Sequence, residues 1–429
     1  MTGKIDWYDD FVEIGYSPAK DDLVCLYYFE PAKGISPSEA AGRIASESSA
    51  GTWTTLHEIP PMVEKIKARA FEIKGKYVKV AYPLDLWEPG NAPQLLSGIA
   101  GNIFGMKALR NLRLMDASLP EKYLKSFKGP NYGIQGIRSI LKIRERPVTG
   151  AVPKPKIGFT AQEHAEVAFE TWMGGFDLVK DDENLTSTSF NRFEDRVEKM
   201  AVSRDRAEKE TGEKKDALIN ITGETKEMIR RAKLLQDSSF KFAMIDVITC
   251  GAASVQTLRD ECSDLGLAIH AHRAMHSAFD RNPKHGLTMY FIAKLMRMIG
   301  VDEIHCGTAV GKLTGTKSEV THIANVLRDR RIDGPYLSQD WGAIKPALPV
   351  SSGGLHPGLI PMVMGILGNN CTLLVSGGIH GHPEGTRAGA KAVMQAIAAT
   401  MEGSSLDEYA LKNRELKLAL EKWEYYRPK

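Results

Sequence analysis

The stretch that decides the fold is GAVPKPKIGFTAQEHAEVAFETWMGGFDLVKDDE, residues 150–183. An apolar segment at 150–158 is followed by an amphipathic segment, AQEHAEVAFETWMGG, and then by a second apolar segment at 176–183. Short apolar runs between turns are typical of buried strands, and the middle segment has the spacing of a helix. Two strands joined by a helix usually lie parallel in one sheet. The stretch therefore predicts one strand–helix–strand unit of an α/β protein.

The same unit recurs through the rest of the chain. Further apolar segments follow, and amphipathic stretches separate most of them. They lie at 216–222, 242–249, 267–274, 303–310, 347–354 and 371–378. Eight strands alternating with helices over roughly 270 residues predict a (β/α)8 TIM barrel. A doubly wound sheet is the rival fold, but it usually has fewer strands and often carries a GxGxxG turn.

The residues before the barrel predict a separate domain. Segments 23–31, 64–75 and 76–87 are rich in the β-branched and aromatic residues of strands, whereas SPSEAAGRIASESS contains a Ser-Pro helix start. Paired strands with two helices predict an α+β domain on one sheet, of the ferredoxin-like kind. We therefore predict an N-terminal α+β domain at 1–137, a catalytic barrel at 138–416 and a C-terminal tail at 417–429.

Composition excludes several classes of protein. The 429 residues carry 56 basic and 53 acidic side chains, a net charge of +3, and the basic residues are spread along the chain. This gives no support for a nucleic-acid or membrane partner. The five cysteines are scattered and form no CxxC pair, which is typical of reduced thiols. Neither a secretion signal nor a membrane-spanning run is visible, so we expect a cytoplasmic protein.

Charged residues and glycines collect at the predicted ends of the barrel strands, where the active sites of such barrels lie. Six of the eight strand ends carry them. They are Lys154 and Lys156; Lys180, Asp182 and Glu183; His270, His272 and Arg273; His305; Ser351, Ser352, Gly353 and Gly354; and Ser376, Gly377 and Gly378. Each one alone has an ordinary structural explanation, such as a solvated charge or a turn. Together they predict an active site.

The types of residue at these ends suggest a substrate. The two glycine turns offer backbone N–H groups that bind anions, and Arg273 with His305 can supply a second cationic corner. Asp182 and Glu183 supply the oxygen ligands that Mg²⁺ prefers. Two anion sites separated by a metal predict a bisphosphate substrate and proton abstraction next to a carbonyl group.

At these residues the chain resembles the large subunit of ribulose-1,5-bisphosphate carboxylase/oxygenase (RuBisCO), nearest the archaeal form III type. The resemblance covers nearly the whole chain and rests on motifs in the family's order. They are ESSAGTWT, GNIFGMKALRNLRL, KPKIG, GGFDLVKDDEN, HAHRAMH, HCGTAVGKL, PVSSGGLHPG and SGGIHGHP. The resemblance implies enolisation of ribulose bisphosphate, addition of CO₂ or O₂, hydration and cleavage to 3-phosphoglycerate. It also implies a place in nucleoside monophosphate (AMP) salvage.

The resemblance implies that Lys180 reacts with CO₂ to form a carbamate, which binds Mg²⁺ together with Asp182 and Glu183. This carbamate would take the C3 proton of the substrate. Lys154 would assist enolisation and protonate the product carbanion, and Lys156 would position Lys154. Cationic neighbours would lower the pKa of Lys180, so that its neutral amine can attack CO₂.

The remaining roles come from the same resemblance. His272 would be the base in hydration of the six-carbon intermediate, and Lys312, in the loop after the sixth strand, would stabilise the incoming CO₂. Asp181 would point away from the site, because side chains alternate along a strand. The implied substrate-binding residues are Glu47, Thr52, Trp53, Asn102, Arg273, His305, Ser352, Gly353, Gly354, Gly377 and Gly378. Arg273, His305 and Ser352 would hold one phosphate, and the glycines with Thr52 and Trp53 the other.

The family supplies Glu47, Thr52, Trp53 and Asn102 from the neighbouring subunit. The resemblance therefore implies an obligate homodimer with shared active sites. It leaves open a higher oligomer such as a decamer, and no small subunit is evident.

Two residues depart from the plant-type pattern near a phosphate loop. Ser376 stands in place of the first glycine of a GGG run, and His380 stands in place of an apolar residue. Two alternative functions stay open: a RuBisCO-like enolase or isomerase acting on a thiosugar phosphate, and a non-catalytic binding protein. Such enolases lose loop and phosphate-site residues that this chain has, and a binding protein does not need six charged or glycine-rich strand ends.

Overall fold

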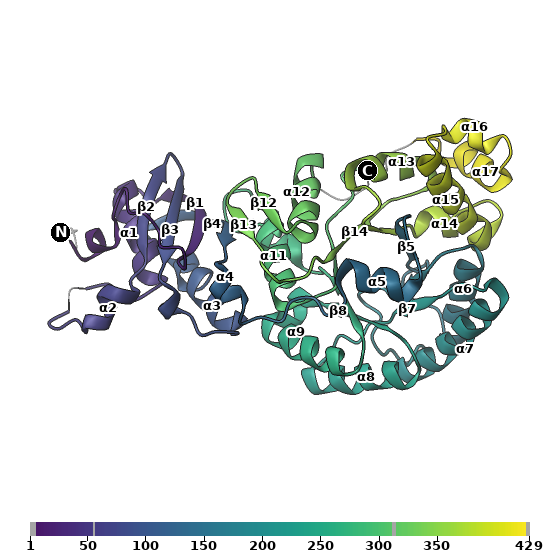
Figure 1. Cartoon of the computed structure of the whole chain (residues 1–429), viewed down its shortest axis with the longest axis horizontal. Helices are drawn as coiled ribbons and strands as arrows, with labels where there is room; N and C mark the ends of the chain where they lie inside the picture. Colours follow the sequence, from purple (N-terminus) through teal and green to yellow (C-terminus); the bar gives the residue numbers. More distant parts are fainter. Residues whose placement is uncertain (1–5, 55, 311–314, 426–429) are drawn as a thin grey trace. The chain divides into compact units, whose positions relative to one another are not determined.

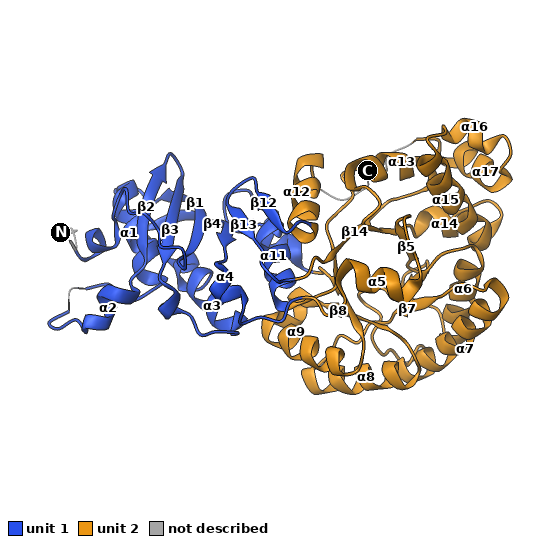
Figure 2. Cartoon of the chain, in the orientation of Figure 1, with its two compact units in different colours: residues 1–129, 275–299, 329–344 blue, residues 130–274, 300–328, 345–429 orange. Residues whose placement is uncertain are grey.

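The computed structural model describes residues 6–54, 56–310 and 315–425, which form two compact units (Figure 2). Unit 1 comprises Met1–Gly129, Met275–Ile299 and Asp329–Ile344, and unit 2 comprises Pro130–Ala274, Gly300–Arg328 and Lys345–Lys429. Residue 137 lies inside helix α5 (Gly133–Leu141), and residues 417–423 belong to helix α17 (Arg414–Trp423). The functional domain limits at 1–137, 138–416 and 417–429 stay a prediction.

Unit 1 is built on a five-stranded sheet of order β10-β4-β1-β3-β2. The strands are β1 (Leu23–Pro31), β2 (Arg69–Lys74), β3 (Tyr77–Tyr82), β4 (Leu109–Ser118) and β10 (Gly286–Leu287). The first four pair antiparallel in the order 4-1-3-2, so the predicted ferredoxin-like domain is confirmed. The short β10 pairs parallel with β4 and comes from the middle of the chain, an addition that the sequence did not predict.

Two helices of unit 1 begin at sequence signals. Helix α1 starts where the Ser36 side chain accepts a hydrogen bond from the backbone N–H of Glu39. The predicted strand at 64–75 is partly wrong, because Pro61 opens helix α2 and the strand begins only at Arg69. The elements are η1 (Asp6–Phe11), α1 (Pro37–Glu47), α2 (Pro61–Ile66), η2 (Leu84–Leu86), α3 (Ala92–Ile99), η3 (Asn102–Gly105), α4 (Glu121–Leu124), α10 (His276–Asp280), α11 (Met289–Ile299), β12 (Arg331–Asp333) and β13 (Ser338–Asp340).

A buried ion pair ties α11 to the sheet of unit 1. Lys294 Nζ donates to Asp116 Oδ1 at 2.8 Å, and both side chains are fully buried. Burial raises the pKa of Asp116, whereas the Lys294 ammonium and two backbone amides favour its charged form. Removing one partner would leave the other charge buried and unpaired, which is costly.

We expect Lys294→Met to lower the free energy of unfolding by about 3–5 kcal/mol. Lys125→Met is the matched control, since Lys125 pairs with Glu121 at 3.0 Å on the surface of the same unit. This control should cost less than about 1 kcal/mol. Chemical denaturation of both variants measures the difference, and equal losses would contradict the account.

Unit 2 contains an eight-stranded parallel sheet of order β7-β6-β5-β15-β14-β11-β9-β8. The strands are β5 (Val148–Ala151), β6 (Leu178–Lys180), β7 (Asp216–Leu218), β8 (Phe242–Asp246), β9 (Ala268–His272), β11 (Glu303–His305), β14 (Leu348–Ser352) and β15 (Thr372–Leu374). Met244 in β8 exchanges backbone hydrogen bonds with Ile219 and Ile221, which follow β7. These bonds close the sheet, so the predicted (β/α)8 barrel is confirmed.

Most helices of unit 2 lie on the outer side of the barrel strands, whereas α5 lies at one end of the barrel (Figure 1). Helix α6 begins with a capping box, in which Thr160 and Glu163 bond to each other's backbone N–H groups. The helices are α5, α6 (Ala161–Met173), α7 (Phe193–Thr211), α8 (Thr225–Asp237), α9 (Val247–Asp264), α12 (Lys317–Arg328), η4 (Pro357–Leu359), α13 (Ile360–Leu367), α14 (Gly377–His380), α15 (Gly385–Glu402), α16 (Leu406–Ala410) and α17. Over the described residues, none of the helices has the length and apolar character that crossing a membrane requires.

The interior of the barrel is apolar at the N-terminal ends of the strands. Ile134, Ile137 and Leu141 of α5 pack there against side chains of six strands. These strand residues are Val148, Leu178, Leu218, Phe242, Met244, Ala268 and Leu348. Hydrophobic packing therefore fills one end of the barrel, and the polar strand ends lie at the other.

Candidate active site

Lys180 is the last residue of β6 and is only 1% exposed. Its Nζ donates to the backbone carbonyl of Asp181 at 2.8 Å. Burial lowers the pKa of Lys180, while the carboxylates of Glu183 and Asp246 oppose this effect. The sequence predicts cationic neighbours as the cause of a lowered pKa, but desolvation is the main cause in the structure. A buried lysine of this kind gives up its proton more readily than one in water.

Asp182, just after β6, lies close to two lysines that follow β5. Its Oδ2 lies 3.5 Å from Lys154 Nζ, and its Oδ1 lies 3.8 Å from Lys156 Nζ. Burial lowers the pKa of Lys154, although the charge of Asp182 opposes this. Both lysines follow β5, which ends at Ala151, so they lie in a loop rather than in the predicted strand at 150–158.

Asp181 points away from this cluster, as strand alternation predicts. Its Oδ2 accepts hydrogen bonds from Arg196 Nε at 2.9 Å and from the backbone N–H of Asn220 at 3.0 Å. His164 Nε2 lies 3.1 Å from Oδ1. Burial favours the neutral acid, but Arg196 and His164 together hold the pKa of Asp181 at about 2. Asp181 therefore anchors the strand end and leaves Asp182 and Glu183 to the site.

The donor set fits a hard divalent cation once Lys180 carries a carbamate, because the carbamate is an anionic oxygen ligand. In the described ranges, no group of three or more His, Cys, Asp or Glu side chains is arranged to hold a metal ion. Asp182 and Glu183 supply two carboxylates beside the Lys180 amine, whose pKa responds to both of them. A carbamate on Lys180 would add the third oxygen ligand that such a cation needs.

His272 ends β9 and is oriented by a residue that the sequence did not single out. Its Nδ1 lies 2.8 Å from Asp246 Oδ1, and its Nε2 lies 3.9 Å from Glu183 Oε2. Burial and the nearby Lys180 lower the pKa of His272, so the neutral ring can act as a base. The signal that could have identified Asp246 is its place as the last residue of β8.

His305 and Ser352 come together from the ends of β11 and β14. His305 Nδ1 lies 2.7 Å from Ser352 Oγ, and the His305 ring contacts the ring of His272 edge to face. Arg273 is buried and belongs to the same end of the barrel. Burial, with the neighbouring His272 and His270 rings, places the pKa of His305 well below its usual value.

The glycine turns after β14 and β15 require glycine for different reasons. Gly353 and Gly354 have φ values of 110° and 76°, which other residues rarely adopt. Gly378 lies so close to the next loop that a Cβ would overlap the carbonyl oxygen of Leu355. A Cβ on Gly377 would meet no atom within 4 Å, so packing does not require glycine at this position.

Ser376 and His380 hold the segment that leads to Lys154. Ser376 Oγ accepts a hydrogen bond from the backbone N–H of Val152 at 2.9 Å, and His380 Nε2 donates to its carbonyl oxygen at 3.0 Å. Val152 lies two residues before Lys154. Ser376 and His380 thus hold both backbone polar groups of Val152, which lies in the loop after β5.

The stability of the protein should depend on His380 between pH 7 and pH 5. Burial lowers the pKa of His380 from 6.5 to about 4. The unfolded state therefore takes up a proton below pH 6.5 that the folded state accepts only near pH 4. Stability is complete above pH 6.5 and falls as the pH drops. We expect the wild type to lose about 2 kcal/mol more than His380→Gln over this range. Denaturation at both pH values measures this, and identical pH dependence of the two proteins would contradict it.

Glu47, Thr52, Trp53 and Asn102 lie in unit 1, whereas the other described site residues lie in unit 2. Glu47 ends α1, and Asn102 begins η3. Trp53 is 75% exposed, which is unusual for a large aromatic side chain. The predicted Lys312 lies outside the described residues.

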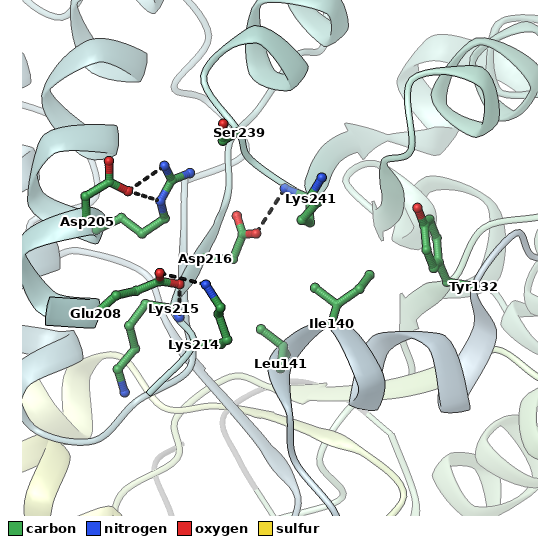
Figure 3. A pocket seen from close by; sticks show the side chains of 11 residues that line it. Tyr132, Ile140, Leu141, Asp205, Glu208, Lys214, Lys215, Asp216, Ser239 and Lys241 are labelled. Atoms are coloured by element: carbon green, nitrogen blue, oxygen red, sulfur yellow. Dashed lines mark hydrogen bonds and ion pairs between the residues drawn. The ribbon is translucent and has the colours of Figure 1, made fainter. Parts of the chain in front are cut away.

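A cavity of about 450 Å³ lies at the opposite end of the barrel from Lys180 and His272, and Figure 3 shows the side chains that line it. Asp216 at the start of β7 and Lys241 just before β8 line it. Several of its polar groups already have partners: Asp216 accepts from two backbone amides, Arg204 pairs with Asp205, and Lys214 pairs with Glu208. The charged and glycine-rich strand ends all lie at the other end of the barrel. We therefore place the candidate active site at the C-terminal ends of the strands.

Comparison with known families gives two matches that together cover most of the chain. Residues 133–423 match the model of the ribulose bisphosphate carboxylase large chain, catalytic domain. Residues 10–123 match the model of the N-terminal domain of the same large chain. A ribulose bisphosphate carboxylase from Pyrococcus furiosus is 54% identical over 430 residues, with 99% of this chain and 100% of the relative covered. One from Methanosarcina barkeri is 47% identical, with 96% and 99% covered.

Solved structures agree with these matches. The octameric ribulose-1,5-bisphosphate carboxylase/oxygenase of Pyrococcus horikoshii, crystallised with sulfate ion, has a TM-score of 0.93 and 51% identity. The alignment covers 98% of this chain and 97% of that one. The dimeric archaeal Rubisco of Hyperthermus butylicus has a TM-score of 0.94 and 48% identity, with 98% and 100% covered.

Proposed function

The chain belongs to the ribulose bisphosphate carboxylase large-chain family, and from this premise we propose that it converts ribulose 1,5-bisphosphate, CO₂ and water into two molecules of 3-phosphoglycerate. The observation that carries the proposal is the meeting of Lys154, Lys180 and His272 at one end of the barrel. Lys154 lies in the loop that follows β5, and Lys180 and His272 are the last residues of β6 and β9. O₂ would compete with CO₂ for the same enolised substrate.

We propose that Lys180 as a carbamate, Asp182 and Glu183 hold Mg²⁺. The support is the donor set: two carboxylates stand beside a buried lysine whose pKa is lowered. When bound, Mg²⁺ stabilises negative charge that develops on the oxygen atoms of the substrate.

The proton transfers fall to three side chains. Lys180 in its carbamate form would accept the C3 proton of the substrate. His272, held by Asp246, would accept a proton from the water that hydrates the six-carbon intermediate. Lys154 would protonate the product carbanion. Lys156, which contacts Asp182, would keep Lys154 in position. Lys312 keeps its predicted role in stabilising the new carboxylate.

The two phosphates would bind on opposite sides of this centre. Arg273, His305 and Ser352 would line one corner, where the buried guanidinium of Arg273 would bind the phosphate and the two other side chains would lie beside it. Gly353, Gly354, Gly377 and Gly378 would offer backbone amides to the other phosphate, with Thr52 and Trp53 completing that corner.

We propose a homodimer in which unit 1 of one chain completes the site of the other. Glu47, Thr52, Trp53 and Asn102 would be the residues contributed by the partner. Support comes from exposed apolar side chains close to Trp53 in the sequence, which a subunit contact would cover. These are Trp53, Leu56, Ile59 and Met62, exposed by 75, 45, 45 and 55%. Dimers and larger even-numbered assemblies without a small subunit are consistent with the dimeric and octameric structural relatives.

The cellular setting is also a proposal. We place the protein in the cytoplasm and in an archaeal type of nucleoside monophosphate salvage, which would supply the bisphosphate. The sequence resemblance to archaeal relatives is the support for this setting.

A product assay tests the proposed function. The purified protein, activated with CO₂ and Mg²⁺, should form 3-phosphoglycerate from ribulose 1,5-bisphosphate. A thiosugar phosphate should not be isomerised under the same conditions. Isomerisation of the thiosugar phosphate without formation of 3-phosphoglycerate would instead identify an enolase or isomerase.

A further inference from the structure

Five side chains form a continuous chain of hydrogen bonds across the strands of the barrel. Thr372 Oγ1 donates to Glu303 Oε2 at 2.8 Å, and Glu303 Oε1 lies 2.7 Å from His270 Nδ1. His270 Nε2 lies 3.0 Å from His305 Nε2, and His305 Nδ1 lies 2.7 Å from Ser352 Oγ. This row of hydrogen bonds thus begins at fully buried residues of β15 and β11 and ends at a partly exposed serine of the candidate site.

The carboxylate at the buried end determines the direction of these bonds. A carboxylate only accepts hydrogen bonds, so Nδ1 of His270 must carry the hydrogen. Burial lowers the pKa of both His270 and His305, and each neutral ring carries one N–H. Nε2 of His270 is then an acceptor, and Nε2 of His305 donates to it.

The same logic continues to the surface of the site. With its hydrogen on Nε2, His305 has a bare Nδ1, which accepts the hydroxyl hydrogen of Ser352. The oxygen of Ser352 is then left with lone pairs, so it can accept a hydrogen bond from a hydroxyl group of the substrate. An uncharged hydrogen-bonding residue in place of Glu303 would not impose this direction, because it could donate to His270 as well as accept.

We infer that Glu303 is a positioning residue, which acts through His270 and His305 to fix the direction of the Ser352 hydroxyl. Thr372 supports it by holding the second carboxylate oxygen. The inference deepens the proposed function and rests on it where ribulose bisphosphate is the kinetic probe.

Glu303→Gln tests the inference, because glutamine keeps the size and polarity but not the fixed acceptor. We expect KM for ribulose bisphosphate to rise about tenfold and kcat to change less than about threefold. In a Ser352→Ala background, the same substitution should change KM less than about twofold, since its effect passes through Ser352. An equal rise in KM in both backgrounds, or no rise in the parent protein, would overturn the inference.

A second pair of variants covers the case in which Glu303→Gln does not fold. Thr372→Val removes the hydroxyl that holds Glu303, whereas Thr372→Ser keeps it. We expect about a threefold rise in KM for valine and none for serine. Equal KM values for the two variants would contradict a role for this hydroxyl in the chain.

Neutron diffraction of the deuterium-exchanged protein shows which ring nitrogens carry hydrogen, and it does not depend on catalytic activity. Deuterium should appear on Nδ1 of His270 and on Nε2 of His305. Deuterium on Nδ1 of His305 would overturn the inference. A protein that makes no 3-phosphoglycerate would contradict the proposed function, while these two positions would still test the direction of the chain.

Discussion

Lys180→Ala is expected to abolish the formation of 3-phosphoglycerate at every concentration of CO₂ and Mg²⁺. The variant loses the amine that would become the third oxygen ligand and the base for the C3 proton. Asp182 and Glu183 then remain as two carboxylates with lysines 3.5 and 3.8 Å from Asp182. We expect activity to fall by about a thousandfold or more, because metal binding and proton abstraction are lost together.

Lys180→Arg is the control for charge and bulk. Its guanidinium keeps a cation at the end of β6 but is always protonated and cannot form a carbamate. It should be as inactive as the alanine variant. Steady-state assays of both variants, with circular dichroism to check folding, give the answer. Near-normal turnover of a folded Lys180 variant would contradict the carbamate mechanism for this protein.

Mixing Glu47→Gln chains with Lys180→Ala chains should restore activity, although each variant alone is inactive. In a mixed dimer, one site combines an intact barrel with an intact unit 1 from the partner, and the other site carries both changes. Random exchange of equal amounts makes half of the dimers mixed, so we expect about a quarter of wild-type activity. The physical basis is that Glu47 and Lys180 lie in different units.

A mixture of Lys180→Ala with His272→Ala is the matched control. Both residues belong to the barrel, so every site in a mixed dimer carries one defect and no activity should return. Native mass spectrometry confirms that the subunits exchange. If the Glu47→Gln mixture stays as inactive as this control after confirmed exchange, the sites are built within single chains.

The sequence predicts the barrel well because each strand is a short apolar run with a polar end. Its strand limits are less accurate. The segment at 150–158 contains Pro153 and Pro155, and strand β5 ends at Ala151, before both prolines. Proline cannot donate a hydrogen bond to a neighbouring strand, which moves Lys154 into the loop. The packing of 275–299 in unit 1 is not visible in the sequence, because the Lys294–Asp116 pair joins residues far apart in the chain.

The candidate site was predicted where it uses the ends of strands, and missed where it depends on partners inside the barrel. Lys180, Asp182 and His272 stand at strand ends and are visible as a pattern. Glu303 stands at the start of β11, and its contact with His270 joins residues 33 positions apart. Neither composition nor spacing reveals such a contact, because it depends on the order of strands in the closed barrel.

The most direct test of the central claim is to supply ¹³C-labelled CO₂ with ribulose 1,5-bisphosphate and to locate the label by NMR. The account predicts one ¹³C for each ribulose bisphosphate consumed by carboxylation, in the carboxyl group of one of the two 3-phosphoglycerate molecules. Consumption of the bisphosphate by the activated protein without any ¹³C in 3-phosphoglycerate would contradict the claim that this barrel is a carboxylase.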